Sequence, residues 1–365
     1  MAVKFSMDPE ALLKAFGIHD KIHFCQPHGS GHIHLSYRIT TDQNAYFLQA
    51  INTRIFTDHL KLESNTKLIA KVLKRYYGDS HSRYYLQFIP LVHDPLSIHH
   101  VDQDSVVWRL SYFVADSFSH DVVPDRAVAY NAAKAFADYI LALSEIPQKS
   151  VYKTIPNFHN ALARFQTFET IIKRNPLPER KSMAQNEIDF CNSRSFLAFK
   201  FQELINNKEL KTRIVHHDTK LNNILFDRTT GDALCVIDLD TTMPGTVLSD
   251  FGDMVRTMCN LAAEDEPDLS KVVFNKEIFG QIAAGYLEVL KEELYPSEIE
   301  SLVFGAKLFC WIQAIRFLGD YLQGDKYYTV NHALQNLHRT KTQIELLKQI
   351  ELQEQDLQNM VQQFV

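Results

Sequence analysis

The segment 214–253 constrains the fold of this chain most strongly. It reads IVHHDTKLNNILF, then the turn DRTTGD, then ALCVIDLDTTMPGTVLSDFGD. Two short apolar runs, 223–226 and 233–239, flank the polar turn, and this pattern predicts a β-hairpin. Whatever polar groups stand at the open end of that hairpin are therefore brought together.

Three polar side chains stand at that end. Asp218 and Asn223 precede or open the first run, and Asp238 lies near the end of the second. A carboxylate beside an attacking hydroxyl, together with oxygen ligands for magnesium, is what phosphoryl transfer from a nucleotide requires. With His216, the spacing reproduces the H-x-D-x-x-x-x-N loop of protein kinases. Asp238 is followed by Leu-Asp instead of Phe-Gly, which argues against a eukaryotic-type protein kinase.

This block resembles the aminoglycoside phosphotransferase and choline kinase superfamily of small-molecule kinases. Within it, DTKLNN, VIDLDTTMPG and SDFGD are most similar to the N-acetylhexosamine 1-kinases, which phosphorylate the anomeric hydroxyl of N-acetylglucosamine or N-acetylgalactosamine. The resemblance covers roughly the whole chain and is densest at 28–56, 214–256 and 309–328. It implies a bilobal protein-kinase-like α+β fold, with ATP as co-substrate and Mg²⁺ as cofactor.

Chain length supports two lobes, because 365 residues exceed the size at which one core usually suffices. We expect residues 1–115 to form an N-lobe whose small antiparallel sheet covers the nucleotide. Residues 116–365 are expected to form a larger helical C-lobe with the catalytic loop, the metal site and the sugar site.

Net charge, cysteine spacing and the lengths of apolar runs limit the classes of partner and the environment that we expect for this protein. A net charge of −6, without long runs of Lys and Arg, argues against nucleic acid and anionic membranes. The five cysteines are scattered and never spaced C-x-x-C, as expected of reduced thiols. No secretory signal stands at the N-terminus, and no apolar run approaches the ~20 residues that span a bilayer. We expect a cytoplasmic monomer or homodimer that binds ATP and a small sugar.

A glycine-containing turn follows the first helical segment, 8–17. It consists of Gly29, Ser30 and Gly31. In a kinase such a loop lays backbone N–H groups over the nucleotide phosphates, so we predict nucleotide binding here. Three histidines, His28, His32 and His34, alternate around the turn, and we expect them to face solvent.

The next strand, 45–52, lacks the lysine that kinases place there to pair with the α- and β-phosphates. Gln49 stands at that position, and the resemblance implies a Q-x-x-N pattern completed by Asn52. Which cation screens the phosphates stays open, with Arg54 as a candidate. In the following helix, 58–77, Glu63 either takes the place of the kinase helix glutamate or is exposed.

Two further runs, 84–89 and 105–114, are expected to complete the sheet. The second resembles the strand that leads into a kinase hinge, which predicts nucleotide contacts at Phe113, Val114 and Asp116. Trp108 and Arg109 are expected to be packing and solvent-edge residues.

Long helical patterns dominate from residue 124 onward. We expect helices at about 124–146, 156–174, 182–207, 248–262, 275–293 and 297–322. The segment 330–365 is predicted to be a helix that docks on the C-lobe, with a dimer contact as the alternative.

The run FCWIQAIRFLGDYLQGDKYY, 309–328, carries a second polar set. Arg316 and Asp320 lie four apart on one helix face, which permits a simple surface ion pair. The apolar surroundings suggest instead that Arg316 is desolvated. The R-F-L-x-D-Y string resembles the sugar-binding helix of the N-acetylhexosamine kinases, which implies Arg316 at a sugar hydroxyl. Asp320 and Tyr328 are the further candidates for substrate binding.

These patterns assign one role to each residue of the block. Asp218 is expected to accept the proton of the acceptor hydroxyl and Lys220 to steady the transferring group, while Asn223 and Asp238 hold Mg²⁺. A kinase of the same fold acting on choline, homoserine or an aminoglycoside is one alternative. A nucleotide-binding protein without catalysis is the other, suggested only by Gln49.

Three further acids accompany the block. Asp250 and Asp253 are expected to brace the catalytic loop and cap the following helix. For Asp240, the sequence leaves open a metal, a substrate or a backbone cap.

Overall fold

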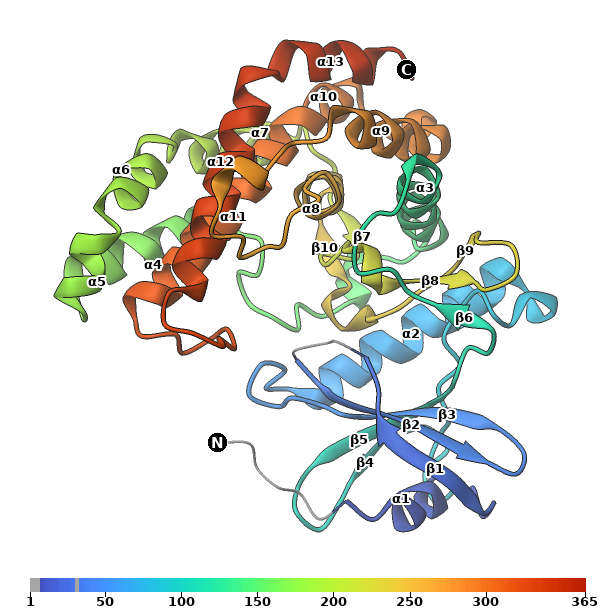
Figure 1. Cartoon of the computed structure of the whole chain (residues 1–365). Helices are drawn as coiled ribbons and strands as arrows, with labels where there is room; N and C mark the ends of the chain where they lie inside the picture. The colour runs from blue at the N-terminus through green and yellow to red at the C-terminus, as the bar shows by residue number, and fades with distance from the viewer. Residues whose placement is uncertain (1–6, 30–32) are drawn as a thin grey trace.

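The fold places a five-stranded antiparallel sheet beside a larger helical region (Figure 1). It is seen in a computed structural model that describes residues 7–29 and 33–365. The strand order is β1-β2-β3-β5-β4. The strands are β1 Ile22–Pro27, β2 Leu35–Thr41, β3 Ala45–Ala50, β4 His99–Val101 and β5 Val107–Tyr112. This arrangement confirms the expected kinase-like α+β class.

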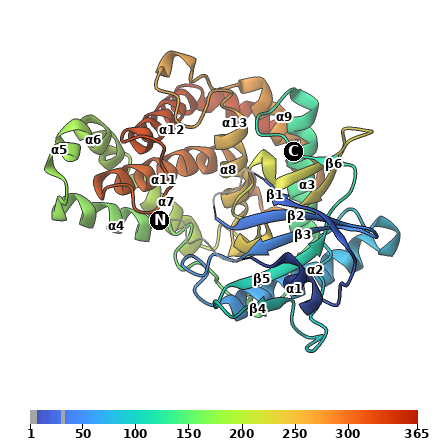
Figure 2. The same ribbon diagram turned by 60° about the horizontal axis from the view of Figure 1, so that its bottom comes forward.

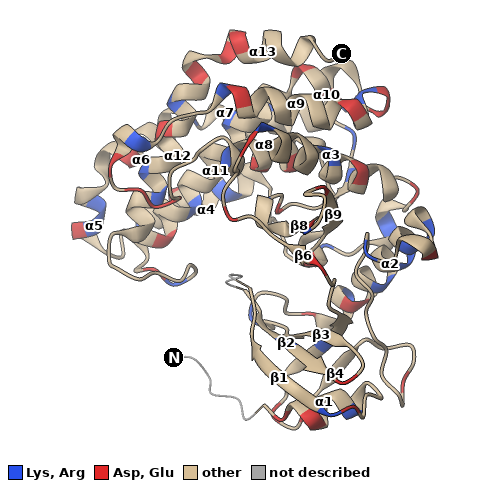
Figure 3. Cartoon of the chain, turned by 45° about the vertical axis from the view of Figure 1, so that its right-hand side comes forward, with Lys and Arg blue, Asp and Glu red and all other residues tan. Residues whose placement is uncertain are grey.

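Two helices lie on opposite sides of the sheet (Figures 1 and 2). Helix α1, Pro9–Ala15, begins at Asp8, whose carboxylate accepts the N–H groups of the first turn. It buries apolar side chains against the sheet. Helix α2, His59–Tyr77, runs between the sheet and the helical region, and its exposed face is basic (Figure 3). Ile69 and Leu73 of α2 belong to the core of the helical region. The lobe boundary at residue 115 stays a prediction.

The sheet differs from expectation at one edge. The expected strand at 84–89 makes only an isolated bridge, Phe88 to Ser111, although Ile89 N–H also donates to the Leu110 carbonyl. Pro90 follows directly and cannot donate to a ladder, so pairing stops there. The edge is instead formed by β4, which the sequence pattern did not reveal.

The helical region contains the predicted hairpin. Strand β8, Ile224–Asp227, pairs antiparallel with β9, Ala233–Val236, and with β6, Ser117–Phe118, on its other side. A second short pair joins β7, Arg213–Val215, to β10, Met243–Gly245. The two pairs hold the ends of the segment that was predicted to carry the polar cluster.

Helices form the rest of this region. They are α3 Arg126–Ala142, α4 Ala161–Arg174, α5 Pro178–Met183, α6 Gln185–Ser193, α7 Phe196–Asn206, α8 Val247–Met258, α9 Lys276–Leu290, α10 Pro296–Glu300, α11 Leu302–Leu322, α12 Gln335–Leu352 and α13 Glu354–Gln362. The single helix expected at 182–207 is divided into pieces. The C-terminal helix docks on α11 as predicted and breaks at Gln353.

Helix α11 is the central element of this core. Its 21 residues are long and apolar enough to cross a membrane by length and composition alone, so the expectation of no such run was wrong. In the fold, 83% of its most apolar window is buried inside the protein. Its apolarity is that of a core helix.

Helices α3 and α9 pack so closely that one contact admits no side chain. A Cβ on Gly285 would collide with the backbone carbonyl oxygen of Tyr130. Gly285→Ala therefore forces the helices apart, and we expect it to lower the free energy of unfolding by about 2 kcal/mol. Urea denaturation followed by circular dichroism measures this loss.

Gly280→Ala, in the same helix, is the matched control. Its Cβ would meet only the terminal methyl group of Met360, at 2.6 Å, and that flexible side chain can move. Here the better helix propensity of alanine should leave stability equal or raised by up to about 1 kcal/mol. Equal losses in the two variants would show that the close helix contact is not the cause.

Candidate active site

The catalytic loop is a stretch of irregular backbone between β7 and β8, and α8 holds it in place. Asp250 accepts the backbone N–H groups of His216 and His217 at 2.9 and 2.8 Å. His217 has a φ of +67°, a left-handed conformation that needs such support. Thr219 N–H donates to Asp253 at 3.1 Å. The two carboxylates thus brace the loop, as expected.

The expected capping role of these acids was wrong. Helix α8 begins after Thr246, and the donors to Asp250 and Asp253 come from the catalytic loop and from Arg256. The helix thus offers its acids to a neighbouring segment instead of to its own first turn.

The imidazole of His216 connects the two halves of the site. Its Nδ1 accepts the N–H of Asp218 at 3.2 Å, so Nε2 carries the proton and donates to the carbonyl oxygen of Ile237 at 2.8 Å. The ring is fully buried. It fixes the catalytic loop relative to the residue that precedes Asp238.

Asp218 faces the open end of the hairpin with one free oxygen. Its Oδ2 accepts from Lys220 at 3.1 Å and from Asn223 at 3.0 Å, whereas Oδ1 accepts from none of the described residues. Burial acts to raise the pKa of Asp218, but the Lys220 ammonium and the hydrogen bond from Asn223 outweigh it and hold this pKa below its usual value. The carboxylate is therefore ionised at neutral pH, with Oδ1 available to a hydroxyl.

Asn223 and Asp238 supply oxygen atoms suited to a hard divalent cation. The Asn223 side-chain nitrogen donates to the Asp218 carbonyl at 2.7 Å, which leaves Oδ1 without a donor among the described residues. Asp238 follows β9 and adopts a left-handed backbone with a φ of +58°. This donor set fits Mg²⁺.

The Asp238 carboxylate lies in an acidic environment. Burial, then Asp240 and Asp218, raise its pKa. Ligand atoms of His34, Asp238 and Asp240 all lie within 4.8 Å of one another. A bound cation would favour the ionised form of Asp238.

The glycine-containing turn is described only in part. Gly29 is exposed with a φ of +89°, a conformation that glycine adopts readily, while Ser30, Gly31 and His32 lie outside the described residues. His28 is exposed, as expected. The expected phosphate contacts of this turn stay a prediction.

Two expectations about the sheet were wrong. Arg109 is not at a solvent edge: it is 3% exposed and donates to both oxygens of Asp240. His34 does not face solvent either, because its side chain is 5% exposed and pairs with Asp240 at 2.7 Å. The sequence feature that could have predicted a buried ionic role for Arg109 is its position as the single charged residue in the apolar run VVWRLSYF. Trp108 is buried, as predicted.

Glu63, the acidic residue of α2, accepts hydrogen bonds from the segment before β4. Glu63 is buried and accepts from the Ser97 hydroxyl and from the N–H groups of Ile98 and His99, with Lys67 of the same helix at 4.0 Å. It is therefore neither exposed nor paired with a lysine of the third strand. Its carboxylate shapes the turn before β4. Gln49 accepts from Arg109 and donates to Ser36.

The predicted hinge connects β5 with β6. Phe113 N–H donates to the Ala45 carbonyl in the sheet, while the carbonyls of Ala115 and Asp116 accept from Arg83. The N–H of Val114 has no acceptor among the described residues. This N–H can therefore donate to a ligand, as can those of Ala115 and Asp116, which likewise have no acceptor among the described residues.

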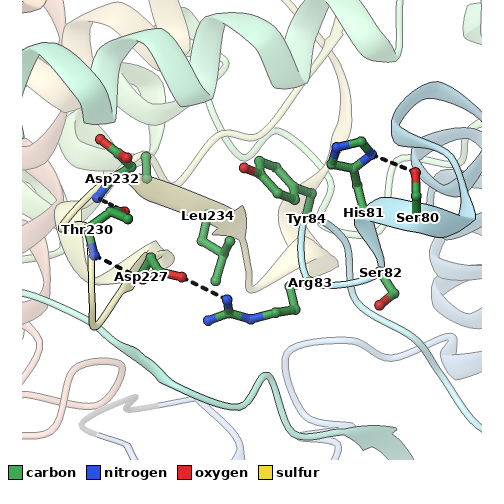
Figure 4. Close-up of a pocket in the computed structure, with 10 residues that line it drawn as sticks. Ser80, His81, Ser82, Arg83, Tyr84, Asp227, Thr230, Asp232 and Leu234 are labelled. Atoms are coloured by element: carbon green, nitrogen blue, oxygen red, sulfur yellow. Dashed lines mark hydrogen bonds and ion pairs between the residues drawn. The ribbon is translucent and has the colours of Figure 1, made fainter.

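Behind the hinge lies a cavity of about 260 Å³ (Figure 4). Arg83 reaches across it to Asp227 at 2.7 Å. The catalytic loop does not line this cavity. Arg83, which lines the cavity, connects the hinge carbonyls of Ala115 and Asp116 to Asp227.

Arg316 lies in an aromatic cage. Its guanidinium is 5.3 Å from the ring of Phe158, 5.9 Å from that of Tyr327 and 5.6 Å from that of Tyr328. The cage connects to the catalytic loop, because His159 stacks on Phe158 and shares a 3.0 Å hydrogen bond with His217.

Asp320 does not pair with Arg316 among the described contacts. Its oxygens accept three backbone N–H groups of the following loop, from Lys326, Tyr327 and Tyr328, and the side chain of Asn336. Both the ion pair and a direct substrate contact by Asp320 are therefore unsupported, because these donors occupy the buried carboxylate. Asp320 instead positions the tyrosines of the cage.

The sheet, the helical region and the acidic cluster together define a phosphotransferase with a kinase-like fold. The chain belongs to the phosphotransferase enzyme family, which it matches over residues 78–270. It is an ATP-dependent enzyme with an alcohol group as acceptor.

Solved structures share this fold at low sequence identity. An aminoglycoside phosphotransferase from Alicyclobacillus acidocaldarius aligns with a TM-score of 0.63 at 11% identity, over 98% of each chain. A spectinomycin phosphotransferase, solved with ADP and spectinomycin, gives 0.60 at 13% identity, over 95% of this chain and 99% of that chain. A choline kinase from Streptococcus pneumoniae gives 0.52 at 10% identity, over 93% and 95%.

The position of Asp218 predicts the effect of removing its charge. Asp218→Asn keeps the hydrogen-bonding shape but loses the proton acceptor, so we expect turnover to fall by ~10²- to 10⁴-fold. ADP release in the presence of an accepted alcohol measures the rate. Asp104→Asn, an exposed acid in a loop of the sheet, should leave the rate unchanged. An unchanged rate in Asp218→Asn would exclude this residue as the base.

His99 predicts a pH dependence of stability. It is buried beside Arg109, and neither ring nitrogen has a partner among the described residues. Burial, then Arg109, lower its pKa to about 4, below the value of about 6.5 in the unfolded chain. Its contribution is thus complete above pH 6.5 and lost as the pH falls toward 4.

His99→Phe removes this titration without removing a described hydrogen bond. Relative to the variant, the wild type should lose about 3 kcal/mol of unfolding free energy between pH 7 and pH 4. Urea unfolding at several pH values measures both proteins, with exposed His93→Phe as control. Parallel curves would mean that His99 titrates normally in the folded state.

Proposed function

We propose that this enzyme transfers the γ-phosphoryl group of ATP to the anomeric hydroxyl of N-acetylglucosamine or N-acetylgalactosamine, with Mg²⁺. The reaction class follows from the family, and the sugar is the proposal. The observation that supports a neutral sugar is the cationic and aromatic character of the Arg316 cage beside the catalytic loop.

A second arginine adds to this positive charge. Arg164 is held by the carbonyl of Phe158, and burial followed by Arg316 lowers its pKa to about 10. The nearby carboxylate of Asp320 is occupied by loop donors. Choline and aminoglycosides are cations and would be repelled here. A neutral sugar offers hydroxyl oxygens to a guanidinium and a face to aromatic rings.

We propose the following roles for the other residues of the site. Asp218 Oδ1 binds the acceptor hydroxyl and takes its proton, and Lys220 lies beside it to steady the transferring group. Asn223 and Asp238 would hold Mg²⁺, which neutralises the phosphate charge when bound. Val114 N–H donates to the adenine base. The turn at Gly29, including Ser30 and Gly31, remains our proposal for covering the phosphates.

The acceptor is tested by magnesium-dependent ADP release against a panel. The panel contains N-acetylglucosamine, N-acetylgalactosamine, glucosamine, glucose, homoserine, choline and kanamycin. We expect turnover confined to the two N-acetyl sugars and an acid-labile product, since anomeric phosphates hydrolyse readily in acid. Asp218→Asn is the blank for each compound.

Two other outcomes would change the proposal. Turnover only with choline, homoserine or kanamycin would keep the reaction and discard the sugar. Nucleotide binding without turnover on any compound would favour the non-catalytic alternative. Arg316→Met separates the cage from the chemistry, because it should raise KM for the sugar while leaving ADP binding unchanged.

A further inference from the structure

The sheet carries a cation next to the position where the third-strand lysine is missing. Gln49 on β3 and Arg109 on β5 are direct cross-strand partners, so both side chains leave the same face of the sheet. Arg109 Nε donates to Gln49 Oε1 at 2.9 Å. Gln49 therefore steers the guanidinium of Arg109 instead of contributing a charge itself.

Arg109 reaches from the sheet to the metal-binding segment of the helical region. Its two terminal nitrogens donate to the two oxygens of Asp240, with an Nη2 to Oδ2 distance of 2.7 Å. The side chains are 4% and 1% exposed. Asp240 is two residues beyond Asp238, so this pair sets the position of the sheet relative to the metal ligand.

His34 completes the anchor from the base of the glycine-containing turn. The N–H of Asn52 donates to His34 Nδ1 at 3.0 Å, so the ring proton sits on Nε2 and is donated to Asp240. Both Asp240 oxygens are thus committed to donors from the sheet. This argues against Asp240 as a metal ligand and for Asp240 as the counter-ion of Arg109.

A kinase pairs its third-strand lysine with a helix glutamate. Here the helix acid Glu63 is occupied by the backbone at Ile98 and His99, and Asp240 takes the position of counter-ion instead. A guanidinium has five N–H groups, of which three are used by Gln49 and Asp240. Two remain for a phosphate.

We propose that Arg109 is the cation that contacts the α- or β-phosphate of the nucleotide, in place of the third-strand lysine, with Gln49 and Asp240 positioning it. The proposal rests on the nucleotide chemistry of the family and is independent of the acceptor. Of the other arginines nearby, Arg54 is exposed and Arg38 lies over the ring of Phe113 at the hinge.

Nucleotide affinity tests this without any turnover. Dissociation constants for adenosine, AMP and ADP, with and without Mg²⁺, are measured by calorimetry on the wild type and on Arg109→Met. We expect ADP to bind ~10- to 100-fold more weakly, the effect of lost charge-assisted hydrogen bonds, and adenosine to bind within about 2-fold of wild type. Arg126→Met, which breaks an exposed ion pair with Glu277, is the matched control.

Two further variants keep the test decisive. Arg109→Met leaves Asp240 buried without its partner, so Arg109→Met/Asp240→Asn removes both charges and should show the same loss for ADP over adenosine. Gln49→Lys in the Arg109→Met background restores a cation on β3 and should recover ADP affinity.

Two outcomes would contradict the assignment of Arg109 as the phosphate-binding cation. Equal weakening of adenosine and ADP would reduce Arg109 to a bridge between the two regions and overturn the proposal. Selective loss of ADP affinity in Arg54→Met instead of Arg109→Met would assign the cation to Arg54. Absence of turnover with every compound of the acceptor panel would contradict the proposed sugar kinase activity without affecting these nucleotide-binding measurements. The proposed activity and the proposed role of Arg109 are therefore tested separately.

Discussion

The hydrogen bonds from the catalytic loop to Asp250 are the contacts on which the site depends. The loop has little regular structure, and the left-handed backbone at His217 is not stable without support. Two N–H groups directed at one buried carboxylate supply that support. Because His216 also reaches the carbonyl of Ile237, fixing the loop also fixes the residue that precedes Asp238. A rigid helix therefore determines the geometry of a segment that is otherwise irregular.

The charges of the site follow a simple balance. Asp218 is kept ionised by Lys220, and Asp240 is neutralised by Arg109, whereas Asp238 lies between the two with a raised pKa. The protein thus pairs two of these carboxylates with its own cations, whereas Asp238 has no ion pair among the described residues, and we propose that a bound cation compensates it. A buried carboxylate without a partner is costly, so a cation bound there would lower the pKa of Asp238 and favour its ionised form.

The sequence predicted the parts of the site that lie close together along the chain. The hairpin, the approach of Asp218, Asn223 and Asp238, and the docking of the last helix follow from local patterns, and they are seen. The partnership of Arg109 with Asp240 joins residues 131 positions apart, and it depends on strand register that no local pattern encodes. The role of Asp320 in holding the following loop was not predicted for a related reason. Its donors are mainly backbone N–H groups, which no sequence pattern distinguishes, and the fourth is the side chain of Asn336, 16 residues away.

The contacts of Arg83 have a mechanical consequence. Residues 115 and 116 are tied through Arg83 to Asp227, and residue 117 pairs with the same strand, so this end of the connection moves with the helical region. Phe113 is tied to β3 and moves with the sheet. Val114 lies between these two sets of contacts, and its own carbonyl accepts from the Ser117 hydroxyl. Its N–H, the proposed contact for the base, therefore stands at the junction of the sheet and the helical region, where a bound base would meet both.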